Sequence, residues 1–150
     1  MGHLSDLRHG AAVRPAVADR ARIVLAVMLI ALAPDGRMQP DSLRRVHRVC
    51  RGAPVLAGIG GEALDELAAL TLRALAARGP DRVLGDLRGL IQRPLAETAL
   101  VMAIRAAFDE GRIAPDVLGI LGGLANYMSI AAAQLSDMLE TVGALERPFD

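Results

Sequence analysis

Several features that commonly point to a protein's function are scarce in this chain. Tryptophan is absent, aromatic residues make up 2% of the 150 residues, and the net charge is zero. Balanced charge produces no overall field toward nucleic acid or anionic lipid, and few side chains are present that stack on bases. Cys50 is the one cysteine, which excludes an internal disulfide and fits a reducing compartment. Nucleic acid is therefore not an expected partner.

Hydrophobic runs of membrane-spanning length are also lacking. The most apolar run, residues 23–33, is 11 residues long, whereas a spanning helix needs about 20. Segment 117–133 is longer, but Asn126, Ser129 and three glycines interrupt it. Residues 1–13 contain an aspartate and no continuous apolar core, so they do not resemble a secretory signal. We expect a soluble cytoplasmic protein without a transmembrane segment, and peripheral membrane association stays open.

Alanine and leucine dominate what is present. The 27 alanines and 23 leucines make up a third of the chain, and both are strong helix formers. Windows rich in β-branched or aromatic residues, which strands favour, are few. A chain of this length can bury about 70% of its unfolded surface, so it needs neither a metal nor a disulfide to fold. These features predict one all-α domain.

Apolar spacing, prolines and glycines divide the chain into about seven expected helices and their loops. Residues 1–14 are expected to form a flexible N-terminal segment, and residues 15–150 a single compact domain. Ser129 is expected to cap the last helix, and Gly143 to end it. The expected helices are residues 15–33, 40–51, 62–77, 80–92, 94–108, 115–127 and 129–142.

A short motif recurs at an offset of 75 residues. Residues 35–41 (DGRMQPD) align with residues 110–116 (EGRIAPD), with four identities and two conservative changes in seven positions. Each copy lies between two expected helices, where its glycine suits the left-handed conformation that ends a helix and its proline suits the start of the next. We interpret the chain as a duplicated helix–turn–helix unit, with repeats at about residues 20–77 and 94–143.

An apolar helix that runs into such a turn and then into an acid-bearing helix, twice in one chain, resembles the TerB-like family. The motif stands here as residues 33–38 (APDGRM) and 108–113 (FDEGRI), and the resemblance covers roughly residues 20–142. It implies a compact helical fold, a cytoplasmic or inner-membrane-associated setting, and a stress-linked role such as tellurite resistance. It also implies divalent metal binding through acids near the turns. The family's glutamate seven positions after the motif aspartate is replaced here by Ser42 and Val117.

Acidic residues near the two turns are the candidate ligands of a divalent cation. Carboxylate oxygens suit Ca²⁺, Mg²⁺ or Mn²⁺, and packing of one turn against the other would bring them together. The alternative is that these acids are helix caps and solvated turn residues. The histidines lack the spacing of a zinc pair, and Cys50 is more typical of a small buried hydrophobe. The candidate ligands are Asp35, Asp41, Asp109, Glu110 and Asp116.

Arg44, Arg48 and Arg51 recur at helical spacing and form a candidate partner-binding stripe. The pattern allows a solvated outer face, contact with an acidic partner protein, or DNA contact. DNA is the least favoured, because the corresponding helix of the second repeat has no basic residue. That helix is free of charge over residues 117–128, and we favour a central core helix there over a homodimer face.

No motif in the chain predicts catalysis. It has no phosphate-binding loop, no nucleophile elbow and no dinucleotide fingerprint, so we expect that it is not an enzyme. The sequence predicts a non-enzymatic TerB-like binding module in a stress-response or envelope-associated context, with protein partners and a divalent cation as its ligands. A metal-free homodimeric adaptor is the alternative, and a small enzyme that uses paired carboxylates is less favoured.

Overall fold

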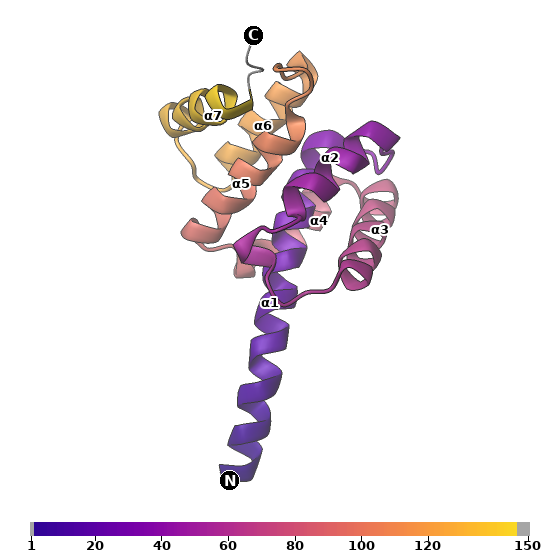
Figure 1. The fold of residues 1–150 in the computed structure, drawn as a ribbon, viewed down its shortest axis with the longest axis vertical. Coiled ribbons are helices and arrows are strands. Elements are labelled where there is room, and N and C mark those ends of the chain that lie inside the picture. The colour runs from indigo at the N-terminus through magenta and orange to yellow at the C-terminus, as the bar shows by residue number, and fades with distance from the viewer. Residues whose placement is uncertain (1, 147–150) are drawn as a thin grey trace.

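The computed structural model describes the backbone of residues 2–146 and the side chains of residues 17–146. Within these residues the chain is all-α, as predicted, with seven α-helices, two short 3-10 turns and no strand (Figure 1). The elements are α1 (Gly2–Leu32), α2 (Pro40–Cys50), η1 (Pro54–Leu56), α3 (Gly61–Arg78), α4 (Pro80–Leu87), η2 (Arg88–Leu90), α5 (Arg93–Ala107), α6 (Pro115–Tyr127) and α7 (Ala132–Glu146).

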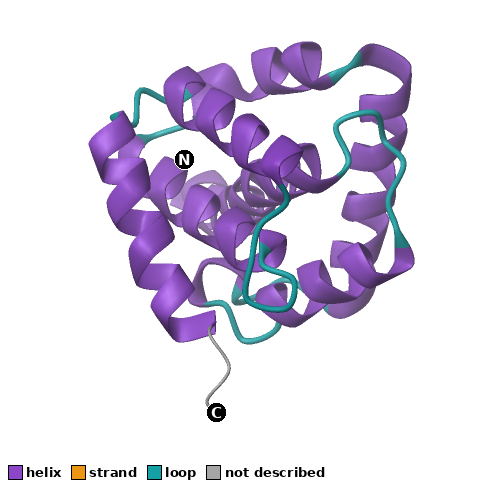
Figure 2. Cartoon of the chain, turned by 90° about the horizontal axis from the view of Figure 1, so that it is seen from above, coloured by secondary structure: helices purple, strands orange, loops and turns teal. Residues whose placement is uncertain are grey.

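The C-terminal half of α1 is the centre of the fold. Every side chain from Ile23 to Ala31 is buried, with no polar residue among them. This part of α1 packs most extensively against α5 and α3, and also touches η1, α4 and α6. The other helices surround it, while the N-terminal part of α1 extends away from them (Figures 1 and 2). A helix that is apolar on all sides is stable in water only when it is enclosed in this way.

The sequence predicted a helix start at Pro15, but α1 begins at Gly2. Proline is common in a first turn, which is why it suggested a boundary. In the structure Pro15 lies inside the helix, where its missing N–H leaves the carbonyl of Ala11 without its usual donor.

Within residues 2–146, none of the helices combines the length and the apolar character that crossing a bilayer requires.

Two boundaries near the C-terminus also differ from the expectation. Ser129 does not cap α7; it adopts a left-handed conformation (φ 60°) just after α6, and α7 begins at Ala132. Gly143 does not end α7, which continues to Glu146. Gly143 instead lies under the ring of Phe108, where an added Cβ would come within 3.3 Å of the ring. The glycine therefore permits close packing of α7 and is not a stop signal.

The prediction that α6 is a central core helix is wrong. Leu121, Leu124 and Ala125 are buried, but Leu118 and Tyr127 are 43% and 39% exposed. The position at the centre belongs to α1, and α6 packs against α1, α5 and α7. Although α6 carries no charge after Asp116, part of its surface is thus left in solvent.

The turn between α1 and α2, which we call the first corner (residues 33–39), is pressed against α3. Gly36 has φ of 82°, and a Cβ at this position would lie 2.5 Å from the carbonyl oxygen of Leu72 and 2.7 Å from the amide nitrogen of Ala76. No side chain fits at that distance from a helix backbone. The glycine is needed both for its conformation and for the close approach of α3.

Gly36→Ala and Gly52→Ala separate these two requirements. Both glycines have positive φ, but a Cβ at Gly52 would meet nothing within 4 Å. Gly52→Ala should cost about 1–2 kcal/mol for the left-handed conformation alone. Gly36→Ala should add the cost of overpacking, for a total of roughly 2–5 kcal/mol in urea unfolding. Equal losses for the two variants would contradict the close packing of the first corner on α3.

Candidate functional site

Each corner contains a glycine and is followed by a proline that begins the next helix, but the two turns differ. In the first corner the Gly36 N–H donates to the Ala33 carbonyl at 2.9 Å, and the Arg37 N–H donates to the Asp35 carboxylate at 3.0 Å. In the second corner (residues 108–114), both Glu110 and Gly111 have positive φ, as in a type I′ turn. The duplication of the sequence stays a prediction, since only the glycine conformation and the helix starts correspond.

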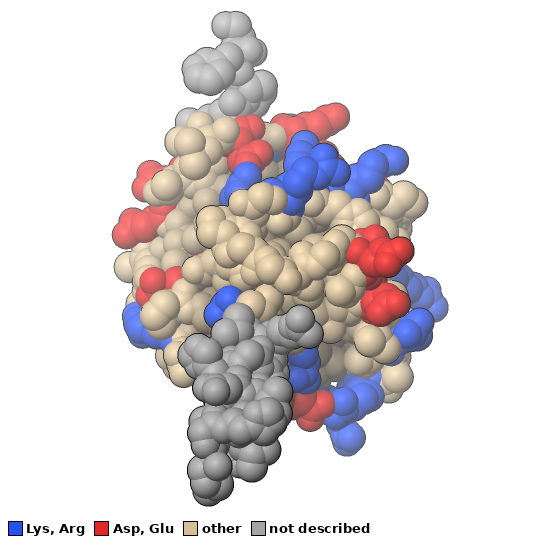
Figure 3. Space-filling view, turned by 60° about the horizontal axis from the view of Figure 1, so that its bottom comes forward, with Lys and Arg blue, Asp and Glu red and all other residues tan. Residues whose placement is uncertain are grey.

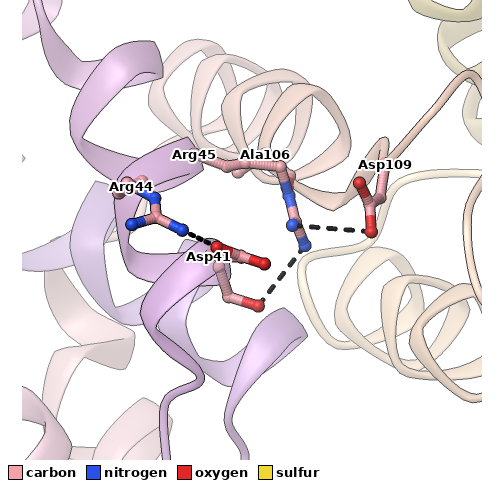
Figure 4. A network of polar contacts seen from close by, with 6 residues as sticks. Asp41, Arg44, Arg45, Ala106 and Asp109 are labelled. Atoms are coloured by element: carbon pink, nitrogen blue, oxygen red, sulfur yellow. Dashed lines mark hydrogen bonds and ion pairs between the residues drawn. The ribbon is translucent and has the colours of Figure 1, made fainter.

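Arg45 joins α2 to the end of α5 and to the second corner (Figure 4). Its side chain is only 14% exposed, and its Nε donates to the carbonyl of Ala106 at 2.8 Å. That carbonyl belongs to the last turn of α5, where helix carbonyls lack a partner and a cation is favourable. The Arg45 Nη1 lies 3.8 Å from the Asp109 carboxylate, and Nη2 donates to the Ser42 hydroxyl at 3.3 Å. Arg45 therefore holds α2 in place.

The candidate metal ligands do not form one cluster. Asp41 and Asp109 line the same groove, but Asp41 is paired with Arg44, and Asp109 with Arg45. Glu110 lines a neighbouring hollow with Asp109, while Asp35 lies in the first corner and Asp116 in the first turn of α6. Across residues 17–146, no three acidic, histidine or cysteine side chains are grouped so as to hold a metal ion. The cation site stays a prediction without geometric support.

The arginine stripe, in contrast, forms a continuous surface. Val46, Val49 and Cys50 bury one face of α2, which leaves Arg44, Arg48 and Arg51 exposed on the other. They line an open groove of about 590 Å³, which we call the arginine groove; its lining residues are Asp41, Arg44, Arg45, His47, Arg48, Arg51 and Asp109. Four arginines against two aspartates make the groove locally cationic. Elsewhere, charges of both signs lie around the edges of an uncharged face (Figure 3).

A second hollow continues from this groove toward α5 and α7. It has a volume of about 430 Å³ and is lined by Arg45, Arg48 and Arg105, together with acids of the second corner and α7. Arg105 lies 3.8 Å from Glu146. No local pattern predicted the roles of Arg45 and Arg105, because both depend on contacts between helices. In the second repeat, the residue that aligns with Arg45 is the apolar Ile120.

Cys50 is a small buried hydrophobe, as predicted. It is 5% exposed, and its sulfur lies 4.0 Å from the sulfur of Met28 in α1. Burial raises the pKa of the Cys50 thiol to about 11, so the thiol is neutral near pH 7. A neutral thiol is a poor nucleophile and a poor metal ligand, which gives Cys50 a packing role.

Comparison with known proteins adds no assignment. No protein-family model matches this chain, and no curated protein or solved structure matches it either. The TerB-like resemblance thus stays a hypothesis that depends on the two turn motifs.

Titration of chelator-stripped protein with Ca²⁺, Mg²⁺ and Mn²⁺ tests the cation site. A ligand that binds only the native state adds about 2.7 kcal/mol at 100 times its dissociation constant, which raises Tm by several degrees. Because Asp41 and Asp109 are paired with arginines, the geometry favours a flat response. A selective, saturable rise that is lost in both Asp35→Asn and Glu110→Gln would establish the site and overturn this expectation.

Proposed function

We propose that the protein is a non-enzymatic binding module whose arginine groove contacts an acidic partner protein. The observation that carries the proposal is the exposure of Arg44 and Arg48 on α2, and of Arg51 just after its end, along one groove. Guanidinium groups arranged in this way suit the carboxylates of a partner, because each can donate two parallel hydrogen bonds. The TerB-like resemblance supports a cytoplasmic, stress-linked or envelope-associated setting for such a complex.

The charges of the groove are available to a partner at low cost. Within residues 17–146, ion pairs involve Arg44 and Arg45 but neither Arg48 nor Arg51. Asp41 and Arg44 are both 74% exposed, and such surface pairs contribute only about 0–1 kcal/mol. A partner carboxylate can therefore replace Asp41 without a large penalty. Arg45 stays in place, since it is half-buried and bonded to α5.

The same exposure argues against a catalytic use of the paired acids. Asp41 and Asp109 are 74% and 68% exposed. Electrostatic catalysis depends on polar groups that are fixed in a site from which water is excluded. Binding places no such demand on the groove, so we propose a role in recognition.

Neutralising the stripe tests this function. A variant that combines Arg44→Gln, Arg48→Gln and Arg51→Gln should bind a fluorescein-labelled decaglutamate peptide about tenfold or more weakly than wild type, because exposed pairs contribute up to about 1 kcal/mol each. Fluorescence anisotropy measures the affinity, which should also fall as salt is raised.

The matched control combines Arg73→Gln, Arg82→Gln and Arg88→Gln, three exposed arginines on other elements. It removes the same charge and should retain the peptide. If both triple variants lose affinity equally, the peptide responds to net charge alone and the groove has no special role. Wild type and the two triple variants are then used to capture proteins from native lysate. A comparison of the captured proteins identifies the natural partner.

The exposed face of α6 supports a second candidate, the homodimeric adaptor. Leu118 and Tyr127 are exposed on opposite flanks of that face, since the helix turns by about 180° between them, and the helix carries no charge after Asp116. A Cβ at Gly119, Gly122 or Gly123 would meet nothing within 4 Å, so packing inside the chain does not require these glycines. Glycine costs about 1 kcal/mol relative to alanine inside a helix. Close approach of another helix is one benefit that offsets this cost.

Leu118→Glu tests the dimer in solution. Since Leu118 is exposed, the substitution should change the free energy of unfolding by less than about 0.5 kcal/mol. If α6 is a dimer face, sedimentation should show a shift from dimer to monomer. Leu121→Glu is the contrasting variant: Leu121 is fully buried, so it should destabilise the protein by several kcal/mol. Wild-type protein that is already monomeric at high concentration would exclude this candidate.

A further inference from the structure

A separate cavity opens at the other end of α2, between its last turn, the loop of η1 and the start of α3. Its volume is about 530 Å³, within the range of about 300–1,000 Å³ that is usual for small-molecule sites. The cavity shares His47 and Arg51 with the arginine groove, but not Arg44 or Arg48. It is therefore a separate cavity from the arginine groove, and the two share Arg51 at one edge.

Apolar side chains form one part of the cavity lining, and polar groups form the rest. Of the apolar lining residues, Leu56 and Cys50 are almost fully buried, and Ile59 and Leu64 are half-buried. These four side chains come from three different elements, so the apolar surface is created by the packing of α2, the η1 loop and α3. An apolar chain placed there would be removed from water on several sides, which favours binding.

The rim of the cavity is polar. Arg51, just after the end of α2, is exposed, and within residues 17–146 its guanidinium makes no ion pair. The one acid of the lining, Asp65, lies 3.2 Å from Nε2 of His47. Because the imidazole engages Asp65, Arg51 is the group of the rim that an anion can reach. Within the described residues, the cavity thus combines a group of apolar side chains with one arginine that no acid pairs with, while the Asp65 carboxylate beside His47 is the anion of the lining.

Gly61, the first residue of α3, is part of the cavity lining. A Cβ at Gly60 or Gly61 would meet nothing within 4 Å. Neither residue has the positive φ that requires glycine. Gly60 is the N-cap of α3, a position that glycine suits, but neither packing nor backbone conformation requires the absence of a side chain at Gly61. It leaves the entrance beside Leu64 free for a ligand.

We propose that this cavity binds a small amphipathic carboxylate, with its apolar chain against Leu56, Ile59 and Leu64 and its carboxylate at Arg51. The apolar side chains of the lining select for chain length, and Arg51 selects for the anion. This site does not depend on the acidic-partner function, since Arg44 and Arg48 take no part in it.

Sodium octanoate is the probe, and amide shifts in ¹H–¹⁵N spectra are the measurement. The amides of Arg51, Gly61 and Leu64 should shift saturably. Each buried methylene strengthens binding about fourfold, so octanoate should bind at least tenfold more tightly than butyrate. Octanamide, which has the same chain without the charge, should bind about tenfold more weakly than octanoate.

Two variants and two controls locate the site. Arg51→Gln should weaken octanoate about tenfold and leave octanamide unchanged, whereas Arg44→Gln should leave octanoate unchanged and weaken only the decaglutamate peptide. Gly61→Leu should fold normally, because the space around Gly61 is open, and should block octanoate. Gly85→Leu, at an exposed and equally open position of α4, should not.

Three outcomes would overturn the proposal. The first is an octanoate affinity that Arg51→Gln leaves unchanged. The second is a set of shifts on the exposed face of α6 instead of around the cavity. The third is binding to vesicles of phosphatidylglycerol without binding to free octanoate, which would indicate a membrane surface and not a small-molecule site. Because the peptide assay uses Arg44, failure here leaves the arginine groove to be judged separately.

Discussion

The enclosure of α1 is the constraint on which the rest of the structure depends. From Ile23 to Ala31 this helix has no polar side, and complete burial of each large aliphatic side chain stabilises the fold by about 1.5–3 kcal/mol. Helices must therefore cover it all round, and α3 and α5 do so most extensively. The first corner follows from the same constraint, since it must turn so closely against α3 that only glycine fits at position 36.

The candidate functional surface is the outer side of this enclosure. α2 turns Val46, Val49 and Cys50 inward, and its arginines are left in solvent. Arg45 lies between the two faces and holds α2 to α5 through the Ala106 carbonyl. This hydrogen bond fixes the position of α2. The exposed arginines of α2 are therefore already arranged before a partner binds. The same packing of α2 against the η1 loop and α3 creates the cavity beside Leu56 and Leu64. Arg51 lies at the edge of both this cavity and the arginine groove.

Local patterns predicted the helices better than they predicted the surroundings of each helix. The ranges of α2 and α6 agree with the expectation within one residue, because Pro40 and Pro115 mark helix starts locally. The interpretation of α6 as a core helix failed, since an uncharged sequence does not reveal whether one side or all sides are covered. The prediction that Ser129 caps α7 was also wrong. Serine suits the residue before a helix, but Ser129 adopts a left-handed conformation just after α6.

The sequence by itself determined the helical class, the positions of the turns and the arginine spacing along α2, because helix propensity, proline, glycine and the 3.6-residue period act between near neighbours in the chain. Only the tertiary structure decided that α1 is central, that Asp41 and Asp109 pair with arginines, and that a partly apolar cavity opens beside Arg51. These features arise from contacts between segments distant in sequence, such as Arg45 with Ala106, and a local pattern holds no information about which distant helix will pack against it.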